Sequence, residues 1–219
     1  MVTLENVKAN ERVISFIKSG DEYLGATGFT EHGLRHASLV AHIAKNIMVR
    51  LKYDERTAEL AAMAAYLHDI GNVVSRHNHG QTGSMISLEI LTKLNMPDDE
   101  AALVVSAIGN HEEEYGLPVN LVSAALIMAD KSDVHRSRVR NQDMKTFDMH
   151  DRVNYAAEHS FLRVNEEERT ITLELSIDTS ISPVMEYFEI FLSRMSMCRK
   201  AASFLDCHFV LMINEVKLL

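Results

Sequence analysis

Histidine and aspartate residues recur at separated positions in the first 130 residues, and the pair His68-Asp69 directly follows the apolar run of residues 61–67. A potentially charged pair in such a place is costly unless an opposite charge compensates it. A divalent cation is one such compensator. Further histidines and an aspartate lie near the ends of expected helices or within them. The candidate metal ligands are His36, His68, Asp69, His79, His111 and Asp130.

The chemistry of this set is that of imidazole nitrogens and carboxylate oxygens without thiolates. Such ligands suit Fe, Mn, Co, Ni, Zn or Mg in open coordination with water. Six ligands exceed what one catalytic ion needs, so the sequence favours two divalent ions. Paired cations activate water for attack on phosphorus without a nucleophilic side chain. Taken singly, each histidine also fits a buried structural role.

Positive charge follows the last candidate ligand, because Lys131 adjoins Asp130. We expect Asp69 and Lys131 to be catalytic. Side chains near the ligands could bind substrate, although a solvated stripe or a surface ion pair is the competing interpretation for several of them. The predicted substrate-binding residues are Arg35, Lys131, Asp133, Arg136 and Arg138.

The ordered motifs resemble the HD-domain metal-dependent phosphohydrolases over residues 25–140. The matching pieces are His36 followed by Val40 and Ala44, then Tyr66-Leu67-His68-Asp69-Ile70-Gly71, His79-Gly80-Gln81-Thr82-Gly83, Ile108-Gly109-Asn110-His111-Glu112 and Met128-Ala129-Asp130-Lys131-Ser132-Asp133. The pattern is similar to the two-metal branch of that family, which includes dinucleotide tetraphosphate hydrolases and cyclic-dinucleotide phosphodiesterases.

The resemblance implies roles for the six ligands. His36, His68, Asp69 and Asp130 would hold one ion, His79 and His111 the other, and Asp69 would bridge them. The cyclic-dinucleotide phosphodiesterases have two consecutive histidines where this chain has Asn110-His111, and a Gly-Tyr-Pro motif where it has residues 115–118. These departures favour a nucleotide phosphohydrolase resembling the dinucleotide tetraphosphate hydrolases.

The elements that must position these residues are mostly helices. Apolar periodicity predicts helices over 31–51, 54–69, 81–94, 98–109, 120–140 and 151–159, with Asn120 as an N-cap. Alternation then predicts a hairpin around residues 166–168, a helix starting at Pro183 and a strand over 209–213. We therefore expect a mainly α fold with two domains: an HD-type helical bundle over 1–159 and a small β-β-α-β appendage over 160–219.

Composition restricts the partners. The 219 residues have a formal net charge of −9 and no run of lysines or arginines, which argues against an extended nucleic-acid surface. No stretch reaches the roughly 20 apolar residues of a membrane span, so we expect a cytoplasmic enzyme without a membrane partner. The expected partner is a small phosphorylated substrate, and the sequence leaves open whether the chain forms a homodimer. The rival hypothesis is a regulatory or binding protein with a structural metal cluster.

Overall fold

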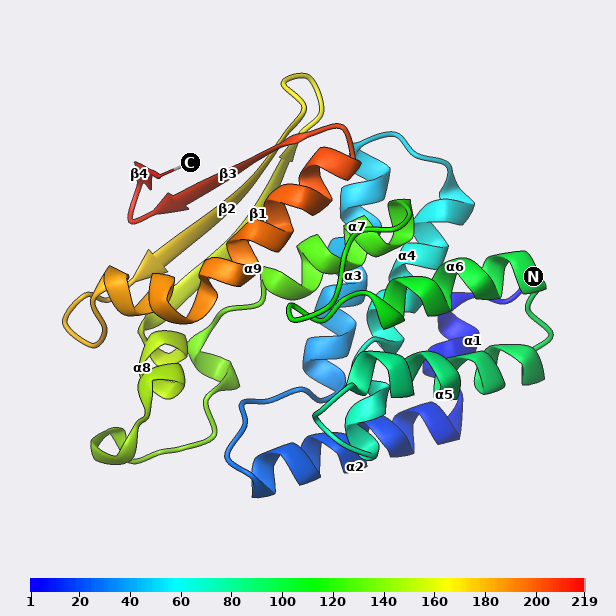
Figure 1. The fold of residues 1–219 in the computed structure, drawn as a ribbon, viewed down its shortest axis with the longest axis horizontal. Coiled ribbons are helices and arrows are strands. Elements are labelled where there is room, and N and C mark those ends of the chain that lie inside the picture. Colours follow the sequence, from blue (N-terminus) through cyan, green and yellow to red (C-terminus); the bar gives the residue numbers. More distant parts are fainter. Residues whose placement is uncertain (219) are drawn as a thin grey trace.

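The computed structural model describes residues 1–218, in which a series of helices precedes a small sheet (Figure 1). The helices before the sheet are α1 (Leu4–Lys8), α2 (Glu11–Ala26), α3 (Leu34–Arg50), α4 (Glu55–Leu67), α5 (His79–Lys93), α6 (Asp98–Gly109), α7 (Leu121–Lys131) and α8 (Met149–Ala156). Short 3-10 turns are η1 (Ile70–Val73), η2 (Arg136–Arg138) and η3 (Met144–Thr146). The remaining elements are β1 (Ala157–Asn165), β2 (Thr170–Ile177), α9 (Val184–Phe204), β3 (His208–Ile213) and β4 (Val216–Lys217).

The expected fold class is confirmed, since a mainly helical region is followed by a small sheet with one helix. Within residues 1–218 the sheet also contains the short β4, which extends the expected β-β-α-β order. The first strand starts at Ala157, within the helix expected over 151–159. The division of the chain into two domains near residue 160 stays a prediction.

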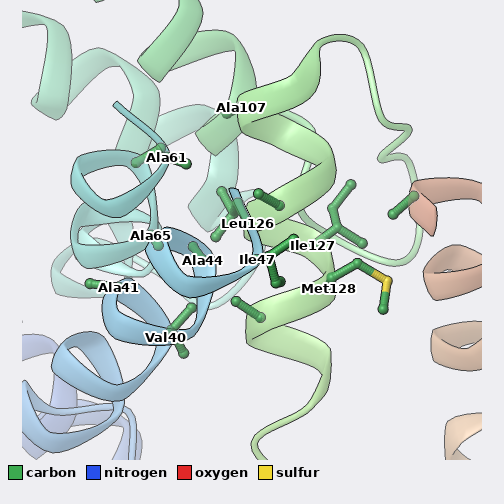
Figure 2. Close-up of a cluster of buried hydrophobic side chains, with 14 of the residues drawn as sticks. Val40, Ala41, Ala44, Ile47, Ala61, Ala65, Ala107, Leu126, Ile127 and Met128 are labelled. Atoms are coloured by element: carbon green, nitrogen blue, oxygen red, sulfur yellow. The ribbon is translucent and has the colours of Figure 1, made fainter. Parts of the chain in front are cut away.

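The core of the helical region lies where α3, α4, α6 and α7 meet (Figure 2). Small side chains such as Ala44, Ala61 and Ala65 are fully buried there. Because alanine projects little beyond the backbone, the helices can approach closely, and larger side chains such as Ile47 and Leu126 fill the remaining space. This close packing fixes the relative positions of the helices that bear the candidate ligands.

Several helix ends follow directly from local sequence. The predicted bounds of α6 are confirmed. Asn120 is confirmed as the N-cap of α7, because its side-chain oxygen accepts a hydrogen bond of 2.8 Å from the Ser123 amide. The same hydrogen bond satisfies an amide that the first turn of a helix leaves without a partner.

The long helix expected over 120–140 is a wrong prediction, because α7 ends at Lys131. The Ser132 hydroxyl donates to the carbonyl oxygen of Ala129 at 2.7 Å, and His135 has an extended backbone with φ −157°. Arg138 then donates to the carbonyl oxygen of Asp133 at 2.7 Å, which folds the chain back on itself. Lys131, His135 and Arg138 therefore do not share one helix face.

Two amino-terminal helices, α1 and α2, were not predicted. Buried Val13, Ile17 and Leu24 lie on one side of α2, and this helix packs beside η1. The close approach places the backbone of Asn72 and Val73 against Gly20, where a side chain would be crowded. Helix α2 thus supports the turn that follows His68 and Asp69.

The sheet has the strand order β1-β2-β3-β4. The pairs β1-β2 and β3-β4 are antiparallel and β2-β3 is parallel, so Leu173 lies opposite both Leu162 and Leu211. Helix α9 connects the parallel strands β2 and β3 and contacts both the sheet and α7 (Figure 1). Among the helices described, none combines the length and apolar character that crossing a membrane requires.

Candidate metal centre

The structure brings the six predicted ligands together from separate elements. His36 lies in α3, His68 and Asp69 follow α4, His79 begins α5, His111 follows α6, and Asp130 lies in α7. Their side chains are between 0% and 13% exposed. Segments separated by up to 94 residues along the chain, from His36 to Asp130, thus form one buried polar cluster.

The cluster contains two groups with spacing suited to a cation. His36, His68 and Asp130 form one group, and His68, Asp69 and His111 form the other; in each, one ligand atom per residue lies within 4.8 Å of the others. The Nε2 atoms of His36 and His68 are 3.3 Å apart, and those of His79 and His111 are 3.0 Å apart. Such close imidazole nitrogens need a proton or a cation between them.

Asp69 lies between the pair His36 and His68 and the pair His79 and His111, and it directs one oxygen to each pair. Its Oδ2 is 3.3 Å from His68 Nε2 and 3.7 Å from His36 Nε2. Its Oδ1 is 3.1 Å from His79 Nε2, on the other side. Within the part of the chain described, Asp69 Oδ2 is buried and accepts no well-oriented hydrogen bond. A buried carboxylate oxygen in this state fits a cation ligand, so these residues suit a divalent metal.

The outer nitrogen of each histidine is held by a hydrogen-bond acceptor. The Nδ1 atoms of His36, His68, His79 and His111 lie 2.6 to 2.9 Å from Asp133 Oδ2 and from the carbonyl oxygens of Ala65, Arg76 and Ile108, respectively. Since Nδ1 donates to these oxygens, the lone pair of Nε2 faces the centre. All four rings therefore present a metal-binding nitrogen to the same space.

Gly71 permits the two halves of the cluster to meet. A Cβ at this position would overlap the carbonyl oxygen of His79 and the amide nitrogen of Gly83. A larger residue would push α5 away from η1, and with it the His79 ring from Asp69. The glycine two positions after Asp69 in the motif therefore has a steric role in the site.

Charges within the cluster are strongly coupled. Burial lowers the pKa of His68, but the carboxylates of Asp69 and Asp130 raise it, with a net rise to about 10. Burial raises the pKa of Asp69, yet the nearby His68 holds it well below its usual value. Burial and the neighbouring His79 lower the pKa of His111. The carboxylates are thus ionised at neutral pH, and a cation competes with the proton on His68.

A cavity of about 620 Å³ opens beside the cluster. It is bounded by residues 27–32, the segment 111–115, α8 and α9, and Asp69, His79, His111 and Asp130 reach its wall. His32 and His77 also lie along it. These four ligands are therefore accessible to a molecule bound in this cavity.

Two of the predicted substrate-binding residues line the cavity. Lys131 is buried, with Nζ 2.7 Å from Asp130 Oδ2 and 3.4 Å from Glu113 Oε1. Arg138 is also buried and donates to the carbonyl oxygens of Asp133 and Glu31. Both cations thus lie within the site, although Arg138 already uses donors to hold the backbone.

The other three predicted substrate-binding residues lie outside the residues that line the cavity. Asp133 instead accepts the hydrogen bond from His36, and Arg35 pairs with Glu31 and Asp133. Arg136 pairs with Glu158 at 2.9 Å and stacks on Tyr155. Arg136 is remote because α7 ends before it, so this cavity gives no support to its predicted substrate binding.

Residues that sequence reasoning missed also line the cavity. Glu112 accepts a hydrogen bond from the Gly80 amide, and its Oε2 lies 3.1 Å from His79 Nδ1. Arg76 lies 3.6 Å from Asp69 Oδ1. In the sequence Glu112 adjoins His111, and Arg76 lies between Asp69 and His79, so both positions could have indicated residues of the site. Arg194 of α9 lines the cavity too, and the surrounding apolar sequence of α9 contains no such signal.

Comparison with known proteins identifies a family. The HD domain family model matches residues 33–152, more than half of the chain. The chain is 33% identical over 122 residues to ribonuclease Y of Aquifex aeolicus and 26% identical over 121 residues to ribonuclease Y of Bacillus pumilus. It is 27% identical over 154 residues to an uncharacterized protein of Methanocaldococcus jannaschii.

These similarities cover only parts of the relatives. The matches take in 55%, 55% and 60% of this chain, but 20% and 22% of the two ribonucleases and 59% of the archaeal protein. A crystal structure of a predicted HD superfamily hydrolase from an uncultured Thermotogales bacterium is similar with a TM-score of 0.45 and 23% identity. That similarity covers 56% of this chain and 67% of the other.

Proposed function

This chain belongs to the HD domain family, and we propose that it is a metal-dependent phosphohydrolase that cleaves a phosphoester or phosphoanhydride of a nucleotide. The proposal includes two divalent cations that share Asp69. His36, His68, Asp69 and Asp130 would hold one cation, and Asp69, His79 and His111 would hold the other; the side chains of each set lie close together.

The observation that supports the proposal most directly is the arrangement around Asp69. Its two carboxylate oxygens face different pairs of histidines, and the Nδ1 atoms of all four rings are engaged elsewhere. Bound cations would supply Lewis acidity and lower the pKa of a water molecule beside the phosphorus. The residues of the chain hold these donors in fixed directions, exclude bulk water and leave the cavity side open.

Lys131 supports a phosphorus-centred reaction in this proposal. Its ammonium group uses one short contact to Asp130 Oδ2 and a longer one to Glu113 Oε1. An ammonium group has three donors, so one remains for a phosphoryl oxygen at the cavity wall. There it would offset negative charge that builds up on the phosphoryl group.

A nucleotide is the favoured substrate class because of the size and lining of the cavity. A volume of about 620 Å³ falls within the usual range for small-molecule sites. Aromatic Phe29, Tyr115 and Phe191 lie along the wall, where a nucleobase could stack. The resemblance to dinucleotide tetraphosphate hydrolases adds a candidate substrate with linked phosphates.

RNA is the second candidate substrate, because two relatives are named ribonuclease Y. The matched segment is about a fifth of those proteins, and the net charge of this chain is −9. A strongly acidic chain disfavours binding to a long polyanion. We therefore rank a small nucleotide above RNA and include both in the test.

The test is a hydrolysis panel with the metal content of the purified protein measured beforehand. Substrates would include nucleoside mono-, di- and triphosphates, a dinucleoside tetraphosphate, a cyclic dinucleotide and a short RNA. In oxygen-labelled water, we expect label in the phosphate-containing product. Absence of turnover of every substrate with the metal sites loaded would reject the proposal in favour of a regulatory or binding protein.

A further inference from the structure

Helix α9 of the carboxy-terminal region places one cation in the cavity wall. The Arg194 side chain is 18% exposed, and its Nε donates to Glu113 Oε1 at 2.9 Å. Its guanidinium carbon lies 4.1 Å from the centre of the Phe191 ring, close enough to stack. The aromatic ring and the carboxylate together hold the flat guanidinium group in one orientation.

The donors that face away from Glu113 have no assigned partner. A guanidinium group has five N–H donors, of which Nε supplies one. Among the residues described, the Arg194 side chain makes one hydrogen bond, from Nε. The four Nη donors are thus free while Arg194 lines the cavity.

Glu113 joins this arginine to the metal centre. Its Oε1 is 2.9 Å from Arg194 Nε and 3.4 Å from Lys131 Nζ, and Lys131 contacts Asp130 Oδ2 at 2.7 Å. Two cations from different helices therefore flank the same carboxylate beside a candidate metal ligand. Glu113 is shared by Lys131 and Arg194, and Asp130 contacts both Lys131 and the histidines of the cluster. These contacts use only some of the N–H donors of the two cations, so both keep free donors.

We propose that Arg194 and Lys131 form a phosphate subsite beside Asp130, in which the Nη donors of Arg194 bind oxygens of the substrate's phosphoryl group. This inference rests on the proposed function and adds a substrate-binding residue from α9. A tetrahedral phosphoryl group presents two oxygens to the parallel donors of a guanidinium fork. Glu113 then acts as a positioning residue, since it fixes Arg194 through Nε and leaves the opposite edge free.

The direct test is calorimetric titration of inorganic phosphate into wild type and Arg194→Met, with metal content measured in each sample. Charge-assisted hydrogen bonds of this kind predict affinity about 10-fold to 100-fold weaker in the variant. Arg199→Met is the matched control, because Arg199 is an exposed arginine of the same helix that does not line the cavity. Its phosphate affinity should equal that of wild type.

A second pair of variants separates phosphate binding from support of the fold. Glu113→Gln removes the charge of the ion pair but keeps a side-chain oxygen that can accept from Arg194 Nε. The arginine should therefore stay in place, and phosphate affinity should stay within about threefold or become tighter. Arg194→Lys keeps the charge without the fork and should give an intermediate affinity. Equal losses in Glu113→Gln and Arg194→Met would overturn the subsite, as would unchanged phosphate binding in Arg194→Met.

The outcome is distinguishable from failure of the proposed function. Hydrolysis by wild type with unchanged kcat/KM in Arg194→Met would overturn the subsite and leave the enzyme proposal intact. Phosphate binding that depends on Arg194, without hydrolysis of any substrate, would support the subsite and reject the enzyme. Failure of wild type to bind phosphate at about 10 mM would also overturn the subsite, because a dissociation constant above that value corresponds to too little binding free energy to hold a substrate.

Discussion

The helical region before β1 and the sheet region after it bury different kinds of side chains. Among the residues described, the buried histidine and charged side chains all precede β1, where they gather around Asp69 and Asp133. The sheet region is filled by apolar residues such as Ile171, Leu173 and Leu211, which lie in register on neighbouring strands. The partly exposed Arg194 of the sheet region pairs with Glu113 and lines the cavity beside the cluster of the helical region.

The difference shows how stability and chemistry are separated in this fold. Burying six ionisable groups together costs free energy unless partners or a cation compensate them. The alanine-rich core of α3, α4 and α7 supplies apolar packing that offsets this cost. Residues 157–218 contain no such cluster, so substitutions in the sheet region should affect stability before they affect metal binding.

The largest expected effect is that of Asp69→Ala, which removes the carboxylate between both histidine pairs. Turnover should fall by more than about 100-fold, the upper end of losses for a residue that only supports a ligand. Metal analysis should show the loss of at least one ion, and added metal, which should raise the Tm of wild type, should no longer raise that of the variant. Asp99→Ala, at an exposed aspartate of α6, is the control. Normal metal content and turnover in Asp69→Ala would refute the proposed centre.

The same truncation in the two regions gives the sharpest comparison. Leu126 in α7 and Leu173 in β2 are both fully buried, and replacement of either by alanine should lower the free energy of unfolding by about 2–5 kcal/mol. Only Leu126→Ala should also weaken metal binding, because α7 bears Asp130. Denaturant unfolding and metal titration measure the two effects. Equal weakening of metal binding by Leu173→Ala would show that the regions are not separate in this respect.

A smaller effect is expected from Asp133→Asn, because Asp133 acts on the centre through His36. Its Oδ2 accepts the hydrogen bond from His36 Nδ1 at 2.7 Å. Loss of such a partner typically lowers metal affinity or activity by about 10-fold to 100-fold. Asp178→Asn in the sheet region provides the match, since Asp178 accepts hydrogen bonds from Ser180. A metal titration in which both variants equal wild type would contradict the proposed orientation of His36.

The smallest effect concerns two arginine-glutamate pairs, one in each region. Hydrogen bonds from Arg56 lower the pKa of Glu100, and hydrogen bonds from Arg163 lower that of Glu174. Glu100→Gln should reduce the free energy of unfolding by up to about 1 kcal/mol. Glu174→Gln should reduce it less, because the Arg163 side chain is 60% exposed to solvent. Paired denaturant unfolding curves at pH 7 compare the two variants.

The pH dependence of both effects follows from the lowered pKa values. A carboxyl group whose pKa is lower in the folded state than in the unfolded state stabilises the folded protein at pH values above its unfolded pKa, which is near 4.5. That stabilisation is lost as pH falls through the folded value. The difference between wild type and each glutamine variant should therefore be complete at pH 7 and shrink below about pH 4.5. A difference that grows in acid would contradict this assignment.

Much of the fold could be predicted because its signals are local. The bounds of α6, the Asn120 cap and the alternation of β2 each depend on residues a few positions apart. The end of α7 at Lys131 could not be predicted in this way, since no glycine or proline marks it. Long-range hydrogen bonds from Arg138 to Glu31, 107 residues away in the chain, hold the chain in its turned path.

By itself the sequence determined the types of ligands, their order and the helices that bear most of them. Imidazole and carboxylate chemistry belongs to the residues, and apolar periodicity belongs to short segments. Only the tertiary structure decided that Asp69 faces both histidine pairs, that Arg136 points away and that Arg194 reaches the cavity. The reason is that convergence depends on how helices pack across distant parts of the chain, and one arginine in an amphipathic helix has the same local pattern whether it meets solvent or a buried carboxylate.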